Sequence, residues 1–146
     1  MAYDLYAFDL FAAPRDRYDF LDWISRSFRS VDGPLASDSS RATPALQAWQ
    51  RDMAQGFPAT IDPHAFDRDS DKPSKNASYQ FSQGVVQASF EWDSSGPALY
   101  RAKKAAQARG VGLFDASSHD GAVWMISTRG RWEVVHRADD SRQSFA

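Results

Sequence analysis

Segments of different hydrophobic periodicity follow one another along this chain of 146 residues, and proline, glycine or serine separates each from the next. Residues 3–9 (YDLYAFD) carry apolar side chains on both alternating sets, which is typical of a strand buried on both faces of its sheet. Helical spacing follows from Pro14 and again from Thr43-Pro44, where threonine before proline marks a helix start. The first part of the chain is therefore expected to form one strand and two helices.

Alternating apolar residues dominate the second part of the chain. Two such segments meet at Gln83-Gly84, which predicts an antiparallel hairpin. A third helical segment follows and is expected to end at Gly110, because glycine is the common residue just beyond a helix. Three further strands are expected within residues 111–115, 122–127 and 131–137.

The resulting order is β-α-α-β-β-α-β with a terminal strand or hairpin, which predicts a single α+β domain over residues 1–146. Its inner part matches the ferredoxin-like, split βαβ arrangement, in which helices lie on one face of an antiparallel sheet. Residues 3–9 and 86–92 then lie in the middle of the sheet. In a second interpretation, residues 122–136 form a separate hairpin beside a smaller mixed sheet. We expect the tail 138–146 to be frayed.

The composition excludes several classes of site. The chain has no cysteine, which removes disulfides, thiolate metal ligands and a cysteine nucleophile. No apolar run approaches the roughly 20 residues that span a bilayer. Asp4 and Asp9 stand where a signal peptide would be apolar. We therefore expect a cytoplasmic protein with no membrane partner.

Charge is distributed unevenly along the chain. Residues 1–71 contain twelve Asp and seven Arg, whereas residues 72–146 contain seven acidic and ten basic residues. One interpretation is an acidic face for a basic partner, and the other is that solvated loops collect aspartate. The segment 57–77 has no hydrophobic period and is longer than most loops, so we expect a binding surface there first. The basic residues do not reach the density of a nucleic-acid binder.

Residues that often carry catalysis or bind metals do not form a known pattern here. His64, His119 and His136 lack the fixed spacing of metal ligands. Neither a G-x-S-x-G motif nor a glycine-rich phosphate loop is present. Aspartates alternate within residues 67–71 as they do at the start of a calcium loop, but the required glycine and glutamate are missing. We therefore expect no cofactor, no metal site and no enzyme activity.

Two carboxylates at strand ends form the basis of an alternative. Asp9 and Asp115 each end a buried strand, and if these strands pair, the two side chains are expected to approach at one sheet edge. Such a pair would suit a metal-dependent or acid/base enzyme. The competing interpretation is that each carboxylate accepts hydrogen bonds from nearby loop N–H groups. A further alternative is a structural subunit that forms a homodimer through its sheet face or an edge strand.

Several stretches between residues 3 and 116 carry a family resemblance: YDLYAFD, APRDR, the helix around Trp23, ATPALQAWQRDM with GFP, and GVGLFDAS. As a set they resemble a group of small bacterial proteins that look like cytoplasmic immunity proteins, found beside polymorphic or contact-delivered toxins. The resemblance implies that the chain neutralises a toxin by binding it, and it implies no catalytic residue. Residues from Trp124 onward lie outside the resemblance.

The acidic half of the chain and the resemblance together predict a contact set for a basic toxin, for example a nuclease domain. The set combines acidic and aromatic residues of the long loop with one aspartate from the loop before the second helix. The predicted partner-binding residues are Asp38, Asp62, Phe66, Asp67, Asp69 and Asp71.

Overall fold

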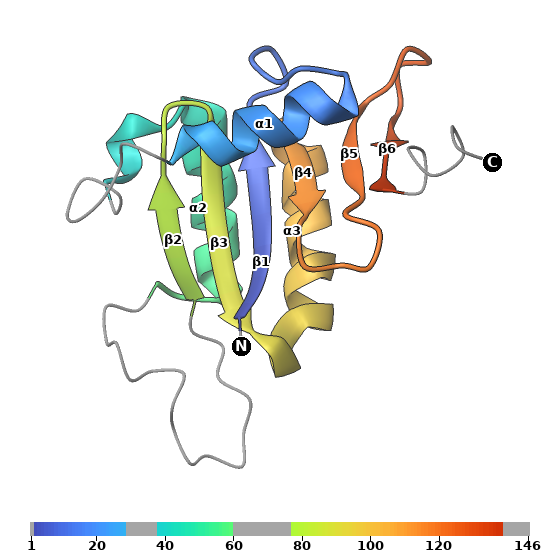
Figure 1. Cartoon of the computed structure of the whole chain (residues 1–146). Coiled ribbons are helices and arrows are strands. Elements are labelled where there is room, and N and C mark those ends of the chain that lie inside the picture. The colour runs from blue at the N-terminus through green and yellow to red at the C-terminus, as the bar shows by residue number, and fades with distance from the viewer. Residues whose placement is uncertain (1, 29–37, 60–76, 139–146) are drawn as a thin grey trace.

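The computed structural model describes residues 2–28, 38–59 and 77–138, which form a six-stranded antiparallel sheet with helices on both faces (Figure 1). The order of strands in the sheet is β2-β3-β1-β4-β5-β6. The predicted α+β class and its antiparallel sheet are therefore confirmed. The strands are β1 (Ala2–Phe8), β2 (Ala77–Phe81), β3 (Val85–Glu91), β4 (Gly112–Asp115), β5 (Val123–Ile126) and β6 (Trp132–His136). The helices are α1 (Arg17–Ser27), α2 (Pro44–Gly56) and α3 (Ser95–Arg109), with short 3-10 turns η2 (Ser39–Arg41) and η3 (Trp92–Ser94).

Strand β1 lies inside the sheet between β3 and β4, as its apolar pattern on both faces predicts. Leu5 is paired with Ala88 of β3 on one side and with Asp115 of β4 on the other. Leu5 and Phe8 are both fully buried, on opposite faces. From β1 to β4 the strands and α-helices follow the predicted chain order β-α-α-β-β-α-β, with β3 and β1 in the interior of the sheet. The ferredoxin-like topology stays a prediction.

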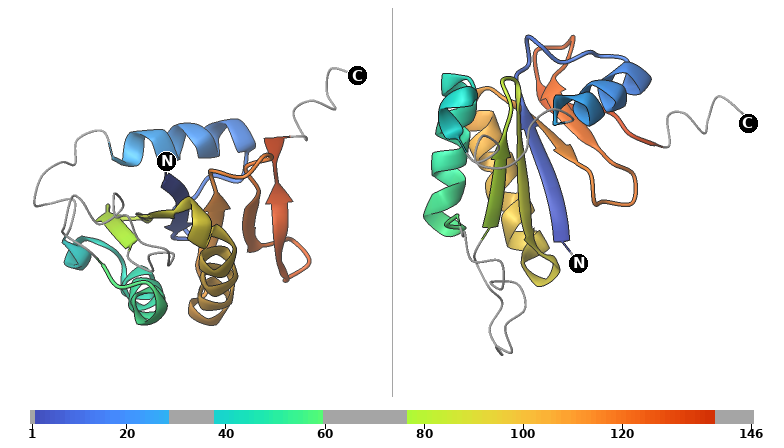
Figure 2. Two further views of the ribbon diagram at one scale, coloured as in Figure 1. Left: turned by 90° about the horizontal axis from the view of Figure 1, so that it is seen from below. Right: turned by 60° about the vertical axis from the view of Figure 1, so that its left-hand side comes forward.

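Helices α2 and α3 lie side by side on one face of the sheet (Figure 2). Thr43 caps α2, since its side chain accepts a hydrogen bond from the Leu46 N–H at 3.3 Å. Trp49 of α2 is fully buried, and its Nε1 donates to the carbonyl oxygen of Ala102 in α3 at 3.2 Å. Gly110 ends α3 with a φ of 72°, the left-handed conformation expected of a glycine at this position. The predicted start of α2 and the predicted end of α3 are therefore confirmed.

Helix α1 lies on the opposite face of the sheet, so the prediction that the helices share one face is wrong (Figure 2). Phe8 of β1 and Phe114 of β4 are apolar side chains on this second face, and the Phe20 ring of α1 packs against both. Burying one large apolar side chain contributes roughly 1.5–3 kcal/mol to the stability of the fold. A helix that covers the apolar side chains of this face therefore stabilises the protein.

Two further predictions need correction. Helix α1 begins at Arg17 instead of near Pro14, because Asp16 caps it by accepting a hydrogen bond from the Asp19 N–H at 3.0 Å. Strands β5 and β6 do not form a separate hairpin, because β5 pairs with β4 and extends the same sheet. Most of the predicted long loop and the predicted frayed tail lie outside the described residues. Among the described helices, none has both the length and the apolar composition needed to cross a bilayer.

Candidate functional site

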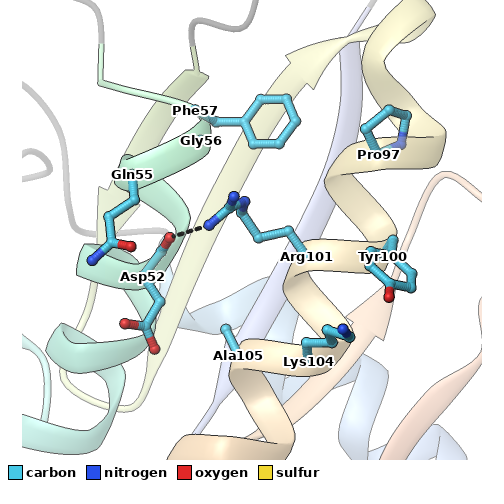
Figure 3. Close-up of a pocket in the computed structure, with 9 residues that line it drawn as sticks. All are labelled: Asp52, Gln55, Gly56, Phe57, Pro97, Tyr100, Arg101, Lys104 and Ala105. Carbon is cyan, nitrogen blue, oxygen red and sulfur yellow. Dashed lines mark hydrogen bonds between the residues drawn. The ribbon is translucent and has the colours of Figure 1, made fainter.

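A groove of about 550 Å³ runs between α2 and α3 on the face away from the sheet (Figure 3). Helix α2 and the residue after it form one wall, and α3 forms the other. Its lining includes polar and charged side chains from both helices, together with Phe57 and Ala105, which also belong to the buried core. The lining residues are Asp52, Gln55, Gly56, Phe57, Pro97, Tyr100, Arg101, Lys104 and Ala105.

Arg101 of α3 reaches across this groove to the end of α2. Its Nη1 donates a hydrogen bond to the main-chain carbonyl oxygen of Asp52 at 3.1 Å (Figure 3). A Cβ atom on Gly56 would lie 2.4 Å from Nε of Arg101, so the guanidinium rests directly against a residue without a side chain. The carbonyl oxygens near the C-terminus of a helix carry partial negative charge, which stabilises a cation placed there. The Asp52 carbonyl and the space left by Gly56 therefore favour this position of the guanidinium.

The remaining charges make the groove cationic. The Asp52 carboxylate accepts hydrogen bonds from Nε and Nη2 of Arg109 at 2.7 and 2.9 Å, and these bonds hold the pKa of Asp52 below its ordinary value. Its charge is therefore balanced by a residue outside the lining. Lys104 lies 4.8 Å from the centroid of the Tyr100 ring, and this ring is 63% exposed. Arg101 and Lys104 are left as the charges that a ligand would meet.

A second distinctive region is the outward side of α1 and the turn before it. Phe11 is fully exposed, Tyr18 is 82% exposed, and Leu21 is also exposed. Aspartates lie among these apolar side chains, and Asp22 forms an ion pair of 2.9 Å with Arg26 on the same helix. We refer to Phe11, Asp16, Tyr18, Asp19, Leu21 and Asp22 as the α1 surface.

Asp115 is a buried carboxyl, and its position contradicts the predicted Asp9–Asp115 pair. Because β1 and β4 are antiparallel, Asp115 lies opposite Leu5, whereas Asp9 lies beyond the Phe8–Gly112 pair at the other end of β4. The hydroxyl of Tyr3 donates to Oδ1 of Asp115 at 2.6 Å. Burial raises the pKa of Asp115, an effect that the Tyr3 hydrogen bond opposes.

The Asp9 carboxylate instead accepts a hydrogen bond from the Phe11 N–H at 2.9 Å. The two carboxylates therefore sit in different surroundings, and each has its own local hydrogen-bond donor. This matches the competing interpretation for Asp9, a strand-end carboxylate that accepts from a loop N–H. The geometry required by a two-carboxylate enzyme site is not met by this pair.

Of the predicted partner-binding residues, the structure describes Asp38. It is exposed, and its Oδ1 accepts hydrogen bonds from the N–H and the hydroxyl of Ser40 at 3.0 and 2.7 Å, which lower its pKa. The other five lie outside the described residues, as does His64: Asp62, Phe66, Asp67, Asp69 and Asp71. Their role stays a prediction.

The two described histidines lie in different settings. His119 is exposed in a turn, whereas His136 is buried with its Nδ1 3.3 Å from Nη1 of Arg17. Within residues 2–28, 38–59 and 77–138, no three His, Asp or Glu side chains come together as a metal site would need. The sheet edges are β2 and β6. A homodimer through either edge stays a prediction.

Sequence reasoning missed the groove. It gave no role to Tyr100, Arg101 or Lys104, which occur in a helical segment with the spacing of solvent-facing residues. One signal was present, because α2 ends in Gly56 followed by Phe57, which leaves space and an aromatic ring at the helix end. The packing of α2 beside α3, which forms the groove, could not be predicted from the sequence.

The described chain is thus an α+β protein with a six-stranded antiparallel sheet, a cationic groove on one side and exposed apolar residues at α1 on the other. Neither a protein-family model, a curated protein nor a solved structure matches it.

Proposed function

We propose that this chain is an immunity-like protein that neutralises a cognate toxin by binding it, as the resemblance of residues 3–116 implies. The observation that carries the proposal is the exposure of Phe11, Tyr18 and Leu21 on the α1 surface. This chain would act in the cytoplasm, by covering a surface of the toxin, and would catalyse no reaction.

The exposed apolar residues of α1 are not needed for its attachment to the sheet. Phe20 and Ile24 provide the buried side of the helix, and Trp23 packs beside them. Tyr18 and Leu21 point outward, where polar side chains would serve folding equally well. A cluster of exposed aromatic and aliphatic residues often marks an interface, and tyrosine is enriched among the residues that dominate binding energy.

Two aspartates of the same surface, Asp16 and Asp19, favour a basic partner, whereas the charge of Asp22 is paired with Arg26. Asp16 and Asp19 lie in the cap and first turn of α1, and Asp22 follows one turn later. Acids at a helix start also stabilise the helix, so their electrostatic effect on a partner adds to a structural one. Opposite charge on a toxin, for example a nuclease domain, would speed association and disfavour wrong partners. The loop aspartates and Asp38 would form a second part of the same contact.

A growth experiment tests this proposal. The C-terminal domain of the secreted protein encoded in the neighbouring reading frame is produced in a bacterial host, with and without this chain. The expected result is growth arrest by the toxin domain alone and full growth when the chain is present. The double variant Tyr18→Ala, Leu21→Ser is expected to lose protection, because removing central interface residues commonly costs about 2 kcal/mol or more each.

The matched control is Tyr100→Ala, which removes an exposed aromatic side chain from the other side of the molecule. This variant is expected to protect as well as the unaltered chain. Protection that survives the α1 double variant but fails in Tyr100→Ala would contradict the choice of surface. A neighbouring reading frame without a toxin, or a toxin that this chain does not counter, would contradict the role itself.

A further inference from the structure

We infer that the groove between α2 and α3 binds a small organic anion that carries a flat apolar group. The inference is independent of the proposed toxin binding, because the groove lies on the opposite side of the sheet from α1 (Figure 2). It rests on three features of the groove: its charge, the hydrogen bond that orients its arginine, and the exposed tyrosine beside it.

The charge of the groove selects an anion. Asp52 is the acidic residue in the lining, and both oxygens of its carboxylate accept hydrogen bonds from Arg109. Arg101 makes one hydrogen bond within the described residues, through Nη1 to the Asp52 carbonyl. Because a guanidinium has five N–H donors, the remaining ones can bind a carboxylate, sulfonate or phosphate oxygen. Lys104 supplies a second positive charge on the same wall.

Arg101 is oriented toward the groove before a ligand arrives. The Asp52 carbonyl holds one end of the guanidinium, and the backbone of Gly56 forms a surface against which the group rests. An arginine already held in place loses less conformational entropy when it binds an anion. The missing side chain at Gly56 is what allows this placement, because a Cβ atom there would overlap the guanidinium.

The other lining residues favour a flat apolar group on the ligand. Tyr100 and Pro97 lie along α3, and Tyr100 is 63% exposed, whereas Phe57 at the end of α2 is buried with its ring against Phe90 (Figure 3). Aromatic rings pack against flat ligands and contribute beyond simple area burial. The groove volume of about 550 Å³ falls in the range of roughly 300–1,000 Å³ that is usual for small-molecule sites. Gln55 adds a hydrogen-bonding amide at the rim.

The test is a titration of the full, ¹⁵N-labelled chain with naphthalene-1-sulfonate, followed by the amide chemical shifts. The shifts are expected to change within residues 52–57 and 97–105, and elsewhere only slightly. The neutral probe 1-naphthalenemethanol is expected to bind at least about tenfold more weakly, since a hydrogen bond to a charged group is worth roughly 1.5–3 kcal/mol. Equal affinity for both probes, or shift changes centred elsewhere, would overturn the inference.

Two variants locate the effect at Arg101. Arg101→Gln removes the charge, and Gly56→Ala keeps every charge but places a methyl group where the guanidinium lies. Both are expected to weaken sulfonate binding about tenfold or more. Lys103→Gln is the matched control, because it removes one positive charge from α3 outside the groove. It is expected to leave binding within about twofold of the unaltered chain.

Unfolding midpoints and near-ultraviolet circular dichroism are recorded for each variant, so that weak binding is not confused with a lost fold. Undiminished binding by folded Gly56→Ala and Arg101→Gln would overturn the inference. A further arm uses hexaglutamate. If this peptide shifts the groove residues while naphthalene-1-sulfonate does not, the groove is a surface for acidic polypeptides, and the inference of a small-molecule site fails.

Discussion

The two faces of the sheet differ in the size of the hydrophobic cluster that each one buries. On one face, α2 and α3 bury a continuous cluster that includes Trp49 and Met53 (Figure 2). On the other, α1 crosses the sheet near the end of β1 and covers a smaller cluster around Phe8 and Phe20 (Figure 1). Stability is therefore concentrated on the α2–α3 face, and the α1 face is left with more surface for other tasks.

Polar residues mark the part of the second face that is not packed into the core. Asp4, Gln87 and Ser89 are half-buried there, and the Ser89 hydroxyl donates to Oδ1 of Asp4 at 2.6 Å. The same strand positions on the other face carry Leu5, Ala88 and other buried apolar residues. Successive side chains of one strand therefore lie in two different environments, the apolar core under α2 and α3 and a polar, half-buried part of the opposite face.

The largest effect is expected from Trp49→Ala, which removes the largest fully buried side chain of the α2–α3 core. It also leaves the Ala102 carbonyl oxygen without the hydrogen bond from the indole. Such a substitution usually costs about 3–5 kcal/mol, a large part of the total stability of a domain. Denaturant titration measures the loss. A cost below about 1.5 kcal/mol would contradict the assignment of the main core to this face.

Two glycine substitutions compare the faces directly. Gly112→Ala is expected to cost about 1–3 kcal/mol, because its Cβ would lie 2.2 Å from the ring of Phe8. That ring is packed against Phe20 and Trp23 and cannot move easily. Gly56→Ala is expected to cost less than about 1 kcal/mol, because the group in its way is the end of a long arginine side chain.

The same denaturant titration decides this comparison. Equal losses for the two variants would mean that the packing around Phe8 adjusts as readily as an arginine at the rim of a groove. The α1 face would then be less tightly packed than its ring contacts indicate.

A pH-dependent effect of intermediate size is expected at Asp115. Since burial raises the pKa of this carboxyl in the folded protein, the folded state holds its proton more tightly than the unfolded state. The contribution of Asp115 to the free energy of unfolding therefore falls as pH rises from about 4, the ordinary value for aspartate, through its raised pKa. Asp115→Asn removes this contribution, while its amide oxygen can still accept the hydrogen bond from Tyr3.

Urea unfolding of both proteins between pH 4 and 7 measures the difference. Other carboxyls, such as Asp52 with its lowered pKa, act in the opposite direction, so the comparison between the two proteins is the informative quantity. The stability of Asp115→Asn relative to the unaltered chain is expected to rise with pH across this range. Parallel curves would show that burial does not perturb Asp115.

The smallest effect on stability is expected at the α1 surface. Tyr18→Ala removes a side chain that is 82% exposed, and substitutions at such positions usually change stability by less than about 0.5 kcal/mol. Thermal unfolding checks this value. A loss above about 1.5 kcal/mol would mean that Tyr18 supports the fold, and it would remove the reason for assigning this residue to a partner.

Much of the local structure could be predicted from the sequence because its signals are local. Thr43-Pro44 and Gly110 predicted helix ends, since capping and backbone conformation depend on neighbouring residues. The two-sided apolar pattern of β1 predicted its interior position. The same pattern does not say which helix covers which face, so the place of α1 was missed.

The candidate site was harder to predict because it depends on contacts between distant segments. Asp9 and Asp115 both end strands, but the ends of antiparallel neighbours lie at opposite ends of a sheet. Arg101 has the helical position of a solvated residue, and only the packing of α3 beside α2 brings it to Gly56. Hydrophobic periodicity indicates which side of a helix or strand is buried. The positions of Asp9, Asp115 and Arg101 depend instead on strand register and on which elements pack together.

The most direct test of the account is a calorimetric titration of the proposed toxin partner, the C-terminal domain encoded in the neighbouring reading frame. Three proteins are compared: the unaltered chain, the double variant Tyr18→Ala/Leu21→Ser, and Tyr100→Ala. We predict that the α1 double variant binds at least about 30-fold more weakly with an unchanged unfolding midpoint, whereas Tyr100→Ala binds normally. Equal affinities for all three proteins would contradict the account, because the exposed apolar residues of α1 would then take no part in binding.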